Sequence, residues 1–464
     1  SLMPKMEAAI RRGNVGYDLE SLQSGIPHVP PFVGNGIVGG CFDSYGFHSR
    51  PTTGSPGGRT HLGYLDHYYR TEHGRHIQFP PAVIGAAFVD GTVFDLKDCA
   101  DYRQELDLLT GTLTTEYDLF GRTAITAMAA QGAPNLFAMK IEREVGQPGR
   151  EFRLTIECAT SACQNNDFPC NVAPVEVRLE PDTDRIKVQS RTNAVTTNWF
   201  VGCCGARMGV EGTRIVIDLP EGTHVLNILF EREGCPGAVM LDEDFESIHD
   251  THRSIWHTFW KASWASFPDT RAQSVWTRSA YYVGCNFPLI HARPMAATGL
   301  ASNVRGFSFP REIYYLAENA PRLGHMERAR WAARYWLDLL EAVGECRARH
   351  TGAEDVYSAR IPLCRDGNND DQDETMGARE PHDHACVAAI VWHYYLISGD
   401  TSFLSTFMPL LEEVFRFYAS ISTGNDKGSY DRAYEHARKG EERPSMAGTL
   451  RNSLRAQWSA HYCA

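Results

Sequence analysis

The chain has 464 residues, of which 43% are hydrophobic, so it can bury a large core and is too long for one ordinary domain. It carries 45 Lys and Arg against 57 Asp and Glu, a formal net charge of −12, which argues against nucleic acids and anionic membranes as partners. No run reaches the ~18 uncharged apolar residues of a membrane helix, and the first residues lack the apolar stretch of a signal peptide. We therefore expect two or three domains in a soluble protein, cytoplasmic by default, with secretion left open.

Before residue 250 the sequence predicts antiparallel β structure. In the segment 151–158, Phe152, Leu154 and Ile156 fall on one face and charged or polar residues on the other, which is the period of a half-buried strand. Similar runs lie at 82–96, 109–119, 121–130, 135–142, 175–180, 185–190, 213–219 and 224–230. Gly, Pro, Asp and Asn separate these runs and no helical stretch intervenes, so they predict a large antiparallel sandwich.

After residue 250 the period becomes helical. Apolar stripes run through 276–287 and 332–343, and further stripes lie at 385–399 and 401–421. Gly399 is expected to end one helix and Asp400 to cap the next. The Trp-rich segment 254–270 predicts a connecting helix packed between the domains. Residues from Ser422 onward are polar and weakly patterned, which predicts an irregular tail.

Thirteen cysteines are spread along the chain without any Cys-x-x-Cys motif. A zinc knuckle or a disulfide framework is therefore not expected, and we interpret the cysteines as reduced packing residues. Residues 34–39 match G-x-G-x-x-G, but no helix follows them, so tight turns between strands are favoured over a dinucleotide site. His61, His67, His73 and His76 follow no metal-binding spacing. They predict a polar loop. Its functional interpretation is that it helps to line a sugar pocket.

Residues 364–392 contain the densest group of ionisable side chains in the sequence. Asp366, Glu374 and Glu380 belong to a cluster of acids that precedes a predicted helix, and His382, Asp383 and His384 open that helix. One or two acids suffice to cap a helix, whereas grouped carboxylates acquire the separated pKa values that acid/base cleavage of a glycoside requires. A solvated acidic loop remains the alternative. Glu312 likewise stands in the first turn of a predicted helix, where an acid needs no function.

Several segments are similar to a known architecture. They are FVGNGIVGG (32–40), QELDLLTGTLTTEY (104–117), the segment 252–269 followed by 276–287, and the segments 298–315 and 379–404. Together they resemble the six-hairpin glycosidases, nearest to glycoside hydrolase family sixty-five, the maltose and trehalose phosphorylase and hydrolase group, and to the fucosidase family ninety-five. The resemblance implies an α+β multidomain chain. Its N-terminal antiparallel β-sandwich (residues 1–250) would be followed by a helical linker (251–270) and an α/α six-hairpin toroid (271–464), with 422–464 as the irregular tail.

The resemblance also implies a function. It implies an inverting glycoside hydrolase or phosphorylase that acts on a small saccharide or glycoside, with phosphate as a co-substrate in the second case, and without a metal or organic cofactor. Where the family has a Trp-Asp-x-Glu string, this chain has Phe309, Pro310, Arg311 and Glu312, and the family's Gly-Pro-Asp-Glu string is absent.

We therefore select candidates by residue. The expected catalytic carboxylates are Glu380, Asp366 and Glu374, and the expected substrate-binding residues are Glu312, Phe309, His382, Asp383, His384 and Trp392. Two of the carboxyl groups should lie about 6.5–9.5 Å apart across one cleft.

The helical half is shorter than the resemblance requires. A closed six-hairpin toroid has twelve helices, whereas the stripes after residue 250 indicate about five or six. We therefore expect an incomplete toroid whose exposed apolar helix faces favour a homo-oligomer. The alternative to an enzyme is a non-catalytic carbohydrate-binding or interaction protein derived from a truncated glycosidase.

Overall fold

The chain forms two compact units. Unit 1 comprises Ser1–Asp66, Gln78–Leu289 and Thr298–Val304, and unit 2 comprises His67–Ile77, Ile290–Ala297 and Arg305–Ala464. The structure is a computed structural model that describes residues 3–24, 27–48, 62–70, 73–92, 94–95, 99–133, 135–144, 146–147, 149–158, 176–191, 196–231, 244–287, 307–308, 310–343, 361–362, 382–420, 422–424 and 430–432.

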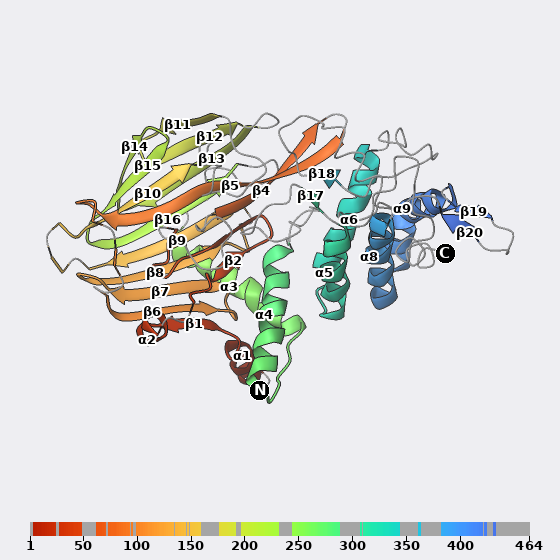
Figure 1. The fold of residues 1–464 in the computed structure, drawn as a ribbon, viewed down its shortest axis with the longest axis horizontal. Coiled ribbons are helices and arrows are strands. Elements are labelled where there is room, and N and C mark those ends of the chain that lie inside the picture. Colours follow the sequence, from red (N-terminus) through yellow and green to blue (C-terminus); the bar gives the residue numbers. More distant parts are fainter. Residues whose placement is uncertain are drawn as a thin grey trace, which may run out of the picture. The chain divides into compact units, whose positions relative to one another are not determined.

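Nine strands of unit 1 form one antiparallel sheet, in the order β1-β6-β7-β8-β9-β16-β13-β12-β11 (Figure 1). Their bounds are β1 Val15–Asp18, β6 Ala100–Asp107, β7 Thr112–Asp118, β8 Arg122–Ala129, β9 Leu136–Arg143, β11 Glu176–Pro181, β12 Arg185–Arg191, β13 Thr196–Cys204 and β16 Gly222–Phe230. β6 to β9 are neighbours in both sequence and space, because antiparallel strands need only short turns between them.

Seven strands form a second antiparallel sheet, in the order β14-β15-β10-β5-β4-β3-β2. Their bounds are β2 Phe32–Gly34, β3 Val38–Cys41, β4 Leu62–Arg70, β5 His73–Phe88, β10 Phe152–Cys158, β14 Arg207–Glu211 and β15 Arg214–Leu219. In β10, Phe152, Leu154 and Ile156 are buried and the residues between them are partly exposed, as the alternation predicted. The Arg143 guanidinium of β9 lies 4.2 Å from the Phe152 ring centre, so the two sheets share a core.

The expectation of a sheet-rich N-terminal region followed by helices is confirmed. Each predicted run overlaps a strand, although the run 82–96 ends as a strand at Phe88. One difference concerns residues 61–76, predicted as a polar loop. Leu62–Arg70 and the start of β5 are strands there, because the three tyrosines favour the extended backbone more strongly than the histidines favour a loop. His61 lies outside the described residues.

The glycine-rich motif is a hairpin turn, as predicted. Gly34 of β2 pairs with Gly39 of β3, and Gly36 between them has a φ of +87°, which glycine adopts without strain. The Asn35 side chain closes the turn, because its Oδ1 accepts hydrogen bonds from the backbone N–H groups of Ile37 and Val38. Its Nδ2 donates to the carbonyl of Ala130, which ties the turn to the end of β8.

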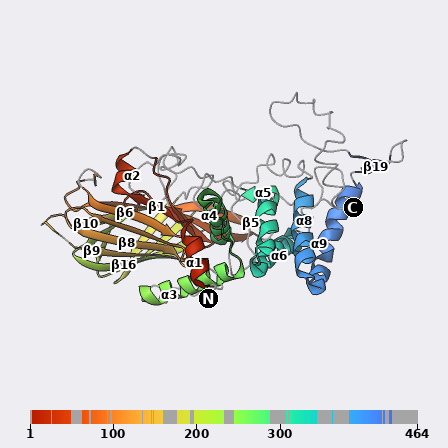
Figure 2. The same ribbon diagram turned by 90° about the horizontal axis from the view of Figure 1, so that it is seen from below.

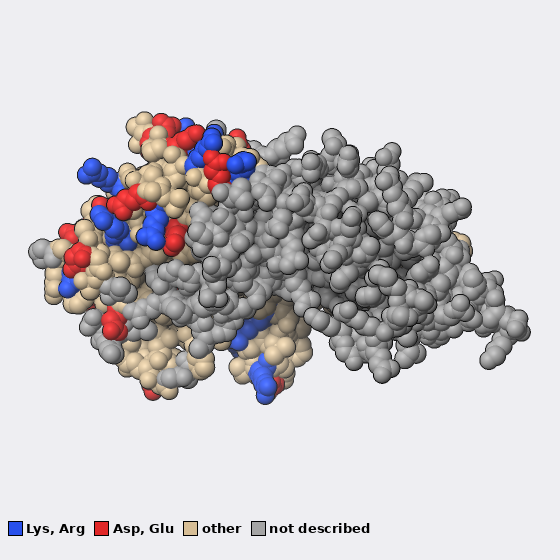
Figure 3. Space-filling model, turned by 45° about the horizontal axis from the view of Figure 1, so that its top comes forward, with Lys and Arg blue, Asp and Glu red and all other residues tan. Residues whose placement is uncertain are grey.

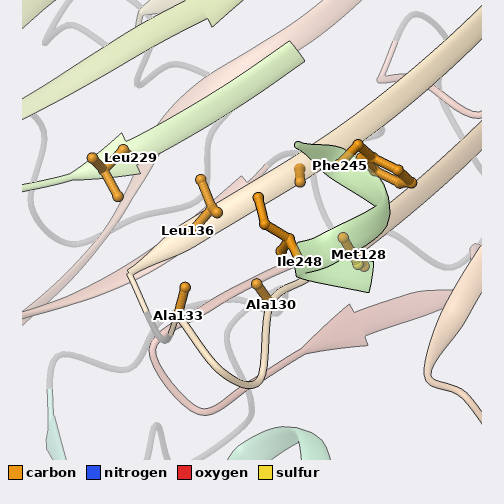
Figure 4. Packing of buried hydrophobic residues seen from close by; sticks show 8 residues of the cluster. Met128, Ala130, Ala133, Leu136, Leu229, Phe245 and Ile248 are labelled. Carbon is orange, nitrogen blue, oxygen red and sulfur yellow. The ribbon is translucent and has the colours of Figure 1, made fainter. Parts of the chain in front are cut away.

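Helix α3 (Phe245–Ala262) covers part of the nine-stranded sheet. Phe245 and Ile248 of α3 pack against Met128, Leu136 and Leu229 of the sheet (Figure 4). Further along the helix Trp256 and Trp260 are buried, and the Trp260 indole donates to the carbonyl of Leu108. The predicted connecting helix therefore exists, but it begins nine residues earlier than the segment 254–270 and ends at Ala262.

Helix α4 (Thr270–Asn286) also belongs to unit 1. The Tyr281 hydroxyl donates to the carbonyl of Phe32 at 2.9 Å, and the Arg278 guanidinium donates to the carbonyl of Gly13, just after α1 (Met3–Arg11). The compact unit thus extends beyond the boundary expected at residue 270. Helical periodicity shows that one face of α4 is buried, but not which part of the chain buries it. Unit 1 also contains the short helix α2 (Leu19–Gln23).

The described part of unit 2 contains two helix pairs, α5 (Pro310–Arg322) with α6 (Met326–Val343), and α8 (His382–Ser398) with α9 (Thr401–Ser420) (Figures 1 and 2). Gly399, with a φ of +65°, ends α8, and the Asp400 carboxylate accepts from the Phe403 N–H of α9, as predicted. Two short pairings, β17 (Phe307–Ser308) with β18 (Ile361–Pro362) and β19 (Ser422–Gly424) with β20 (Tyr430–Arg432), also belong to unit 2, as do the described residues within His67–Ile77. The expected irregular tail therefore starts with a small hairpin. Residues 433–464 lie outside the described residues.

Charges of both signs are interspersed on the described surface shown in Figure 3. Many form pairs across strands, such as Arg153 with Asp218 and Arg191 with Glu176. Among the described residues no helix is long and apolar enough to cross a membrane. Most of the described cysteines are buried, as expected for packing residues.

Candidate functional site

The helices that carry the predicted site residues, α5 and α8, pack against each other in unit 2. Pro310 opens α5, where its fixed φ suits the first helical position and its missing N–H costs nothing. The segment Ala385–Val391 of α8 is apolar on all sides, and each of its residues is buried. A helix buried on all sides lies at the centre of its domain, so α8 is held by α5, α6 and α9 together.

A polar cluster links α5 to α8 in this apolar setting. The Glu318 carboxylate of α5 lies 3.2 Å from Nδ1 of His393 on α8, and it also pairs with Arg322 one turn further along α5. The Tyr314 ring contacts the His393 imidazole edge-on, with the ring centres 5.8 Å apart. The Glu318 and His393 side chains are both mostly buried, so the pair forms a directional polar contact between the two helices.

The pKa of His393 is lowered from its ordinary value. Burial is the largest cause, and the Arg322 cation lowers the pKa further. The Glu318 carboxylate acts in the opposite direction, but it does not outweigh the other two. At neutral pH His393 is therefore an uncharged imidazole, and the Glu318 charge is balanced by Arg322.

Two substitutions should move the pKa of His393 in opposite directions. Glu318→Gln removes the stabilising carboxylate and leaves the Arg322 cation, so the pKa of His393 should fall further. Arg322→Gln removes the repelling cation and leaves the carboxylate, so the pKa should rise toward its ordinary value. NMR titration of histidine-labelled protein measures both. Shifts of the same sign in the two variants would contradict this arrangement.

The structure places only some of the predicted site residues. Glu312 is the third residue of α5, and His382, Asp383 and His384 are the first three residues of α8. Phe309, Asp366, Glu374 and Glu380 lie outside the described residues. The expected separation of two catalytic carboxyl groups therefore stays a prediction.

The described backbone sets limits on how these residues can cooperate. Glu312 precedes the middle of the Tyr314–Glu318 segment by four residues, about 6 Å of helix, and His382 precedes His393 by eleven, about 16 Å. Because α5 and α8 run side by side and meet at His393, the Cα atoms of Glu312 and His382 are separated by roughly 10 Å or more along the helices. A separation of this size is compatible with two residues that line one substrate-sized pocket.

Trp392 lies at a different level of α8 from the three polar residues at its start. It is ten residues from His382, about 15 Å along the helix, its side chain is 40% exposed and its ring contacts Tyr395. A sugar held by the first turn of α8 would therefore not reach Trp392 unless it extended over several rings.

Sequence reasoning did not identify the Tyr314–Glu318–Arg322–His393 cluster. The only local signal was the spacing of Tyr314, Glu318 and Arg322, four residues apart on one face of α5. Their partner is 75 residues downstream of Glu318, and no local pattern predicts that contact. Among the described residues, no group of three His, Cys, Asp or Glu side chains could hold a metal ion.

No family model and no curated protein matches the sequence. Among solved structures, the fold is similar to that of a protein titled "Putative kojibiose phosphorylase from human microbiome", with a TM-score of 0.65 at 12% sequence identity. The superposition covers 97% of this chain and 64% of that chain, so this chain spans just under two thirds of the other's length. The likeness extends through both units and shows a shared fold, in which an antiparallel, sheet-rich region precedes a helical one.

Proposed function

We propose that this chain is a carbohydrate-active enzyme that cleaves the glycosidic bond of a small glycoside, by phosphorolysis or hydrolysis, with inversion at the anomeric carbon. The observation that carries the proposal is the fold likeness to a protein titled as a phosphorylase, which extends over 97% of this chain. The segments that resemble the six-hairpin glycosidases support it independently, because they come from both units.

The proposal includes the finer architecture. The two antiparallel sheets would form the β-sandwich of that superfamily, and the α5–α6 and α8–α9 pairs would be hairpins of an α/α toroid. In such a ring the hollow centre would bind the saccharide. That placement would give Glu312 and the polar residues at the start of α8 one common function.

The chemistry follows from the residue types. Glu380 would protonate the glycosidic oxygen, while Asp366 or Glu374 activates water, or phosphate attacks directly from the opposite face of the sugar. The bond from the anomeric carbon to the leaving oxygen breaks, and the new bond forms to water or phosphate oxygen. The first N–H groups of α8 lack helical partners and lie at the positive end of the helix dipole, which suits phosphate or sugar oxygens. Glu312, Phe309, His382, Asp383 and His384 would hold the sugar at the bond that is cleaved, and Trp392 would contact a sugar ring further along the substrate.

An activity assay tests the proposal. The protein is incubated with a panel of α-linked glucosyl disaccharides, with and without phosphate, and the free sugar and the sugar 1-phosphate are measured. For an inverting phosphorylase we expect phosphate-dependent release of the β-anomer of the sugar phosphate. Glu380→Gln should lower kcat/KM by about 10²–10⁴-fold, the usual range for loss of a general acid.

Glu327→Gln provides the matched control. Glu327 is an exposed carboxylate in the first turn of α6, and its removal should leave kcat/KM unchanged. No turnover of any glycoside, together with saturable sugar binding, would contradict the enzyme and support the non-catalytic carbohydrate-binding alternative. If turnover is unchanged in Glu380→Gln, Asp366→Asn and Glu374→Gln, the assignment of these carboxylates as catalytic is contradicted. The proposed enzymatic activity itself is not contradicted by that result.

A further inference from the structure

Helix α9 carries two apolar stripes, of which only one is buried. The buried stripe consists of Phe403, Phe407, Leu410 and Val414. Each of these residues is followed in the sequence by another apolar residue. These four residues form the second stripe, Leu404, Met408, Leu411 and Phe415. Because successive residues of an α-helix lie about 100° apart around its axis, the second stripe lies to one side of the buried one.

The second stripe is accessible to solvent. Met408 is 41% exposed and Phe415 is 56% exposed, and the other two members are partly exposed. The next positions around the helix, Ser405, Pro409 and Glu412, are also exposed, and the apolar arc ends there. Single exposed apolar side chains are common on protein surfaces, but a helix normally has only its buried face apolar. The second stripe is therefore wide enough to need a covering group of its own.

The chain that follows α9 returns to the end of this helix. β19 begins at Ser422, two residues after the last residue of α9, and it contacts that helix. Ser422 pairs with Arg432, the last residue of β20. Paired strands lie about 4.8 Å apart, so residues 433–464 start beside the C-terminal end of α9.

The segment 450–462, which lies outside the described residues, has an apolar pattern that matches the second stripe. Its apolar residues recur every four positions, which is the spacing of one helical face. They are Leu450, Leu454, Trp458 and Tyr462. The residues next to this pattern include Arg451, Asn452 and Arg455, so the opposite side is polar.

The segment can reach the second stripe. Seventeen residues, 433–449, separate it from the end of β20, and seventeen residues can span at most about 55–60 Å. The second stripe extends over about 17 Å of helix, from Leu404 to Phe415. A tethered segment also has an advantage over a separate molecule, because the tether sets a high effective concentration at the surface.

Charge favours this segment over a second copy of the chain, which exposed helix faces alone would also allow. Residues 433–464 contain five Lys and Arg against three Glu, a net charge of +2, whereas the whole chain carries −12. The C-terminal residues are therefore attracted to the rest of the chain, whereas two copies of the chain repel each other. Arg451 and Arg455 lie within the segment, and Glu412 borders the second stripe.

We propose that the segment 450–462 binds to the second stripe of α9 and covers it. Leu450, Leu454, Trp458 and Tyr462 form its contact face, and burial of the two apolar stripes against each other drives the association. The second stripe is thus a docking surface within unit 2, and its occupant is a segment of the same chain. This contact does not depend on the proposed carbohydrate activity.

Hydrogen exchange of the full chain, measured by mass spectrometry, tests the contact. Leu454→Glu and Trp458→Glu each place a charge in the contact face. Amides of residues 401–420 should then exchange about tenfold or more faster than in the unmodified protein, because α9 loses its cover. Asn452→Glu is the matched control, since it adds the same charge on the opposite side of the pattern and should leave the exchange unchanged. Exchange in β10 shows whether each variant remains folded.

A reciprocal experiment changes the helix and follows the segment. Trypsin cleaves after Arg451 and Arg455, and a bound segment is cut more slowly than an unbound one. Phe415→Ser should accelerate cleavage at these two bonds about tenfold. Ser405→Ala, which changes an exposed residue outside the stripe, should leave the cleavage rate unchanged.

Three results would overturn the proposal. The first is unchanged exchange of α9 in both Leu454→Glu and Trp458→Glu, and the second is equal cleavage of Phe415→Ser and the unmodified protein. The third is a dimer, detected by light scattering, that Phe415→Ser dissociates, because a second copy would then occupy the stripe. Docking by the segment instead predicts that Phe415→Ser and the unmodified protein have the same mass in solution.

Discussion

Gly111→Ala is expected to lower the free energy of unfolding by about 2–5 kcal/mol. Gly111 ends the turn between β6 and β7 with a φ of +64°, a backbone conformation that a residue with a Cβ adopts only with strain. A Cβ built at this position would lie 2.1 Å from Nε1 of Trp256 and 2.4 Å from its Cε2, far inside van der Waals contact. Backbone strain and overpacking therefore act together.

Neighbouring side chains prevent the Trp256 ring from moving away from a Cβ at position 111. It is almost fully buried, and its other neighbours are Phe259, Trp260 and Tyr281, with the Tyr281 ring centre 5.0 Å away. Because a protein interior is close-packed, such an overlap displaces the neighbouring groups instead of being relieved locally. The contact between Gly111 and Trp256 is thus a point at which the β6–β7 turn fixes how α3 lies on the sheet.

Gly91→Ala is the matched control. Gly91 also has a positive φ, +83°, but a Cβ there meets nothing within 4 Å, so its substitution should cost only the backbone strain of about 1–2 kcal/mol. Urea unfolding followed by tryptophan fluorescence measures both variants. Equal losses for Gly111→Ala and Gly91→Ala would show that the indole contact contributes nothing.

The sequence predicted the strands whose two faces differ and missed others. β10 alternates apolar and polar residues throughout, so its pattern could be read directly. β13 has the same alternation of burial, with Trp199 and Val201 inward. Because the apolar Phe200 occupies an outward position, the sequence of β13 does not alternate between apolar and polar residues. Side-chain type reports burial only when the outward residues are polar, and a sheet tolerates outward aromatic residues.

Helix boundaries were harder to predict for a related reason. The buried stripe of α3 begins at Phe245 and continues through Ile248, His252 and Trp256, so a histidine interrupts the apolar pattern. The segment before it therefore did not read as helix. The segment Ala385–Val391 of α8 poses the opposite problem. It is apolar on all sides, which predicts burial but does not tell which neighbouring element buries it.

The candidate site was predictable only where it lies at helix ends. The start of α8 at His382 and the place of Glu312 in the first turn of α5 agree with the patterns. The contact of Glu318 with His393 depends on how two distant helices pack, which no local pattern encodes. The residues from 363 to 381, which hold the expected acids, lie outside the described residues, so their assignment stays a prediction.

His252, which interrupts the apolar stripe of α3, should make the stability of unit 1 depend on pH. His252 is almost fully buried, and burial lowers its pKa to about 3, although its hydrogen bond to the Gly111 carbonyl acts in the opposite direction. Its Nδ1 accepts from the Gln131 N–H at 3.1 Å, so the proton is on Nε2, which donates to the carbonyl of Gly111. The neutral imidazole thus satisfies both bonds, and the protonated form cannot.

The sign of the effect follows from linkage. Below the ordinary histidine pKa of about 6.5 the unfolded chain binds a proton at His252, whereas the folded chain does not until the pH approaches 3. Stability is therefore complete above pH ~6.5 and falls as the pH decreases. At pH 5 the loss amounts to about 1.5 pH units at 1.36 kcal/mol each, or about 2 kcal/mol.

His252→Gln removes the titration while keeping an amide that can donate and accept hydrogen bonds. The variant should lose some stability at pH 7, but its free energy of unfolding should fall by about 2 kcal/mol less than that of the unmodified protein between pH 7 and pH 5. Urea unfolding at the two pH values measures the difference. His257→Gln is the control, because His257 lies on the same helix and is partly exposed. An unchanged pH dependence in His252→Gln would show that the imidazole is already protonated in the folded chain, and that α3 is held to the sheet in a different way.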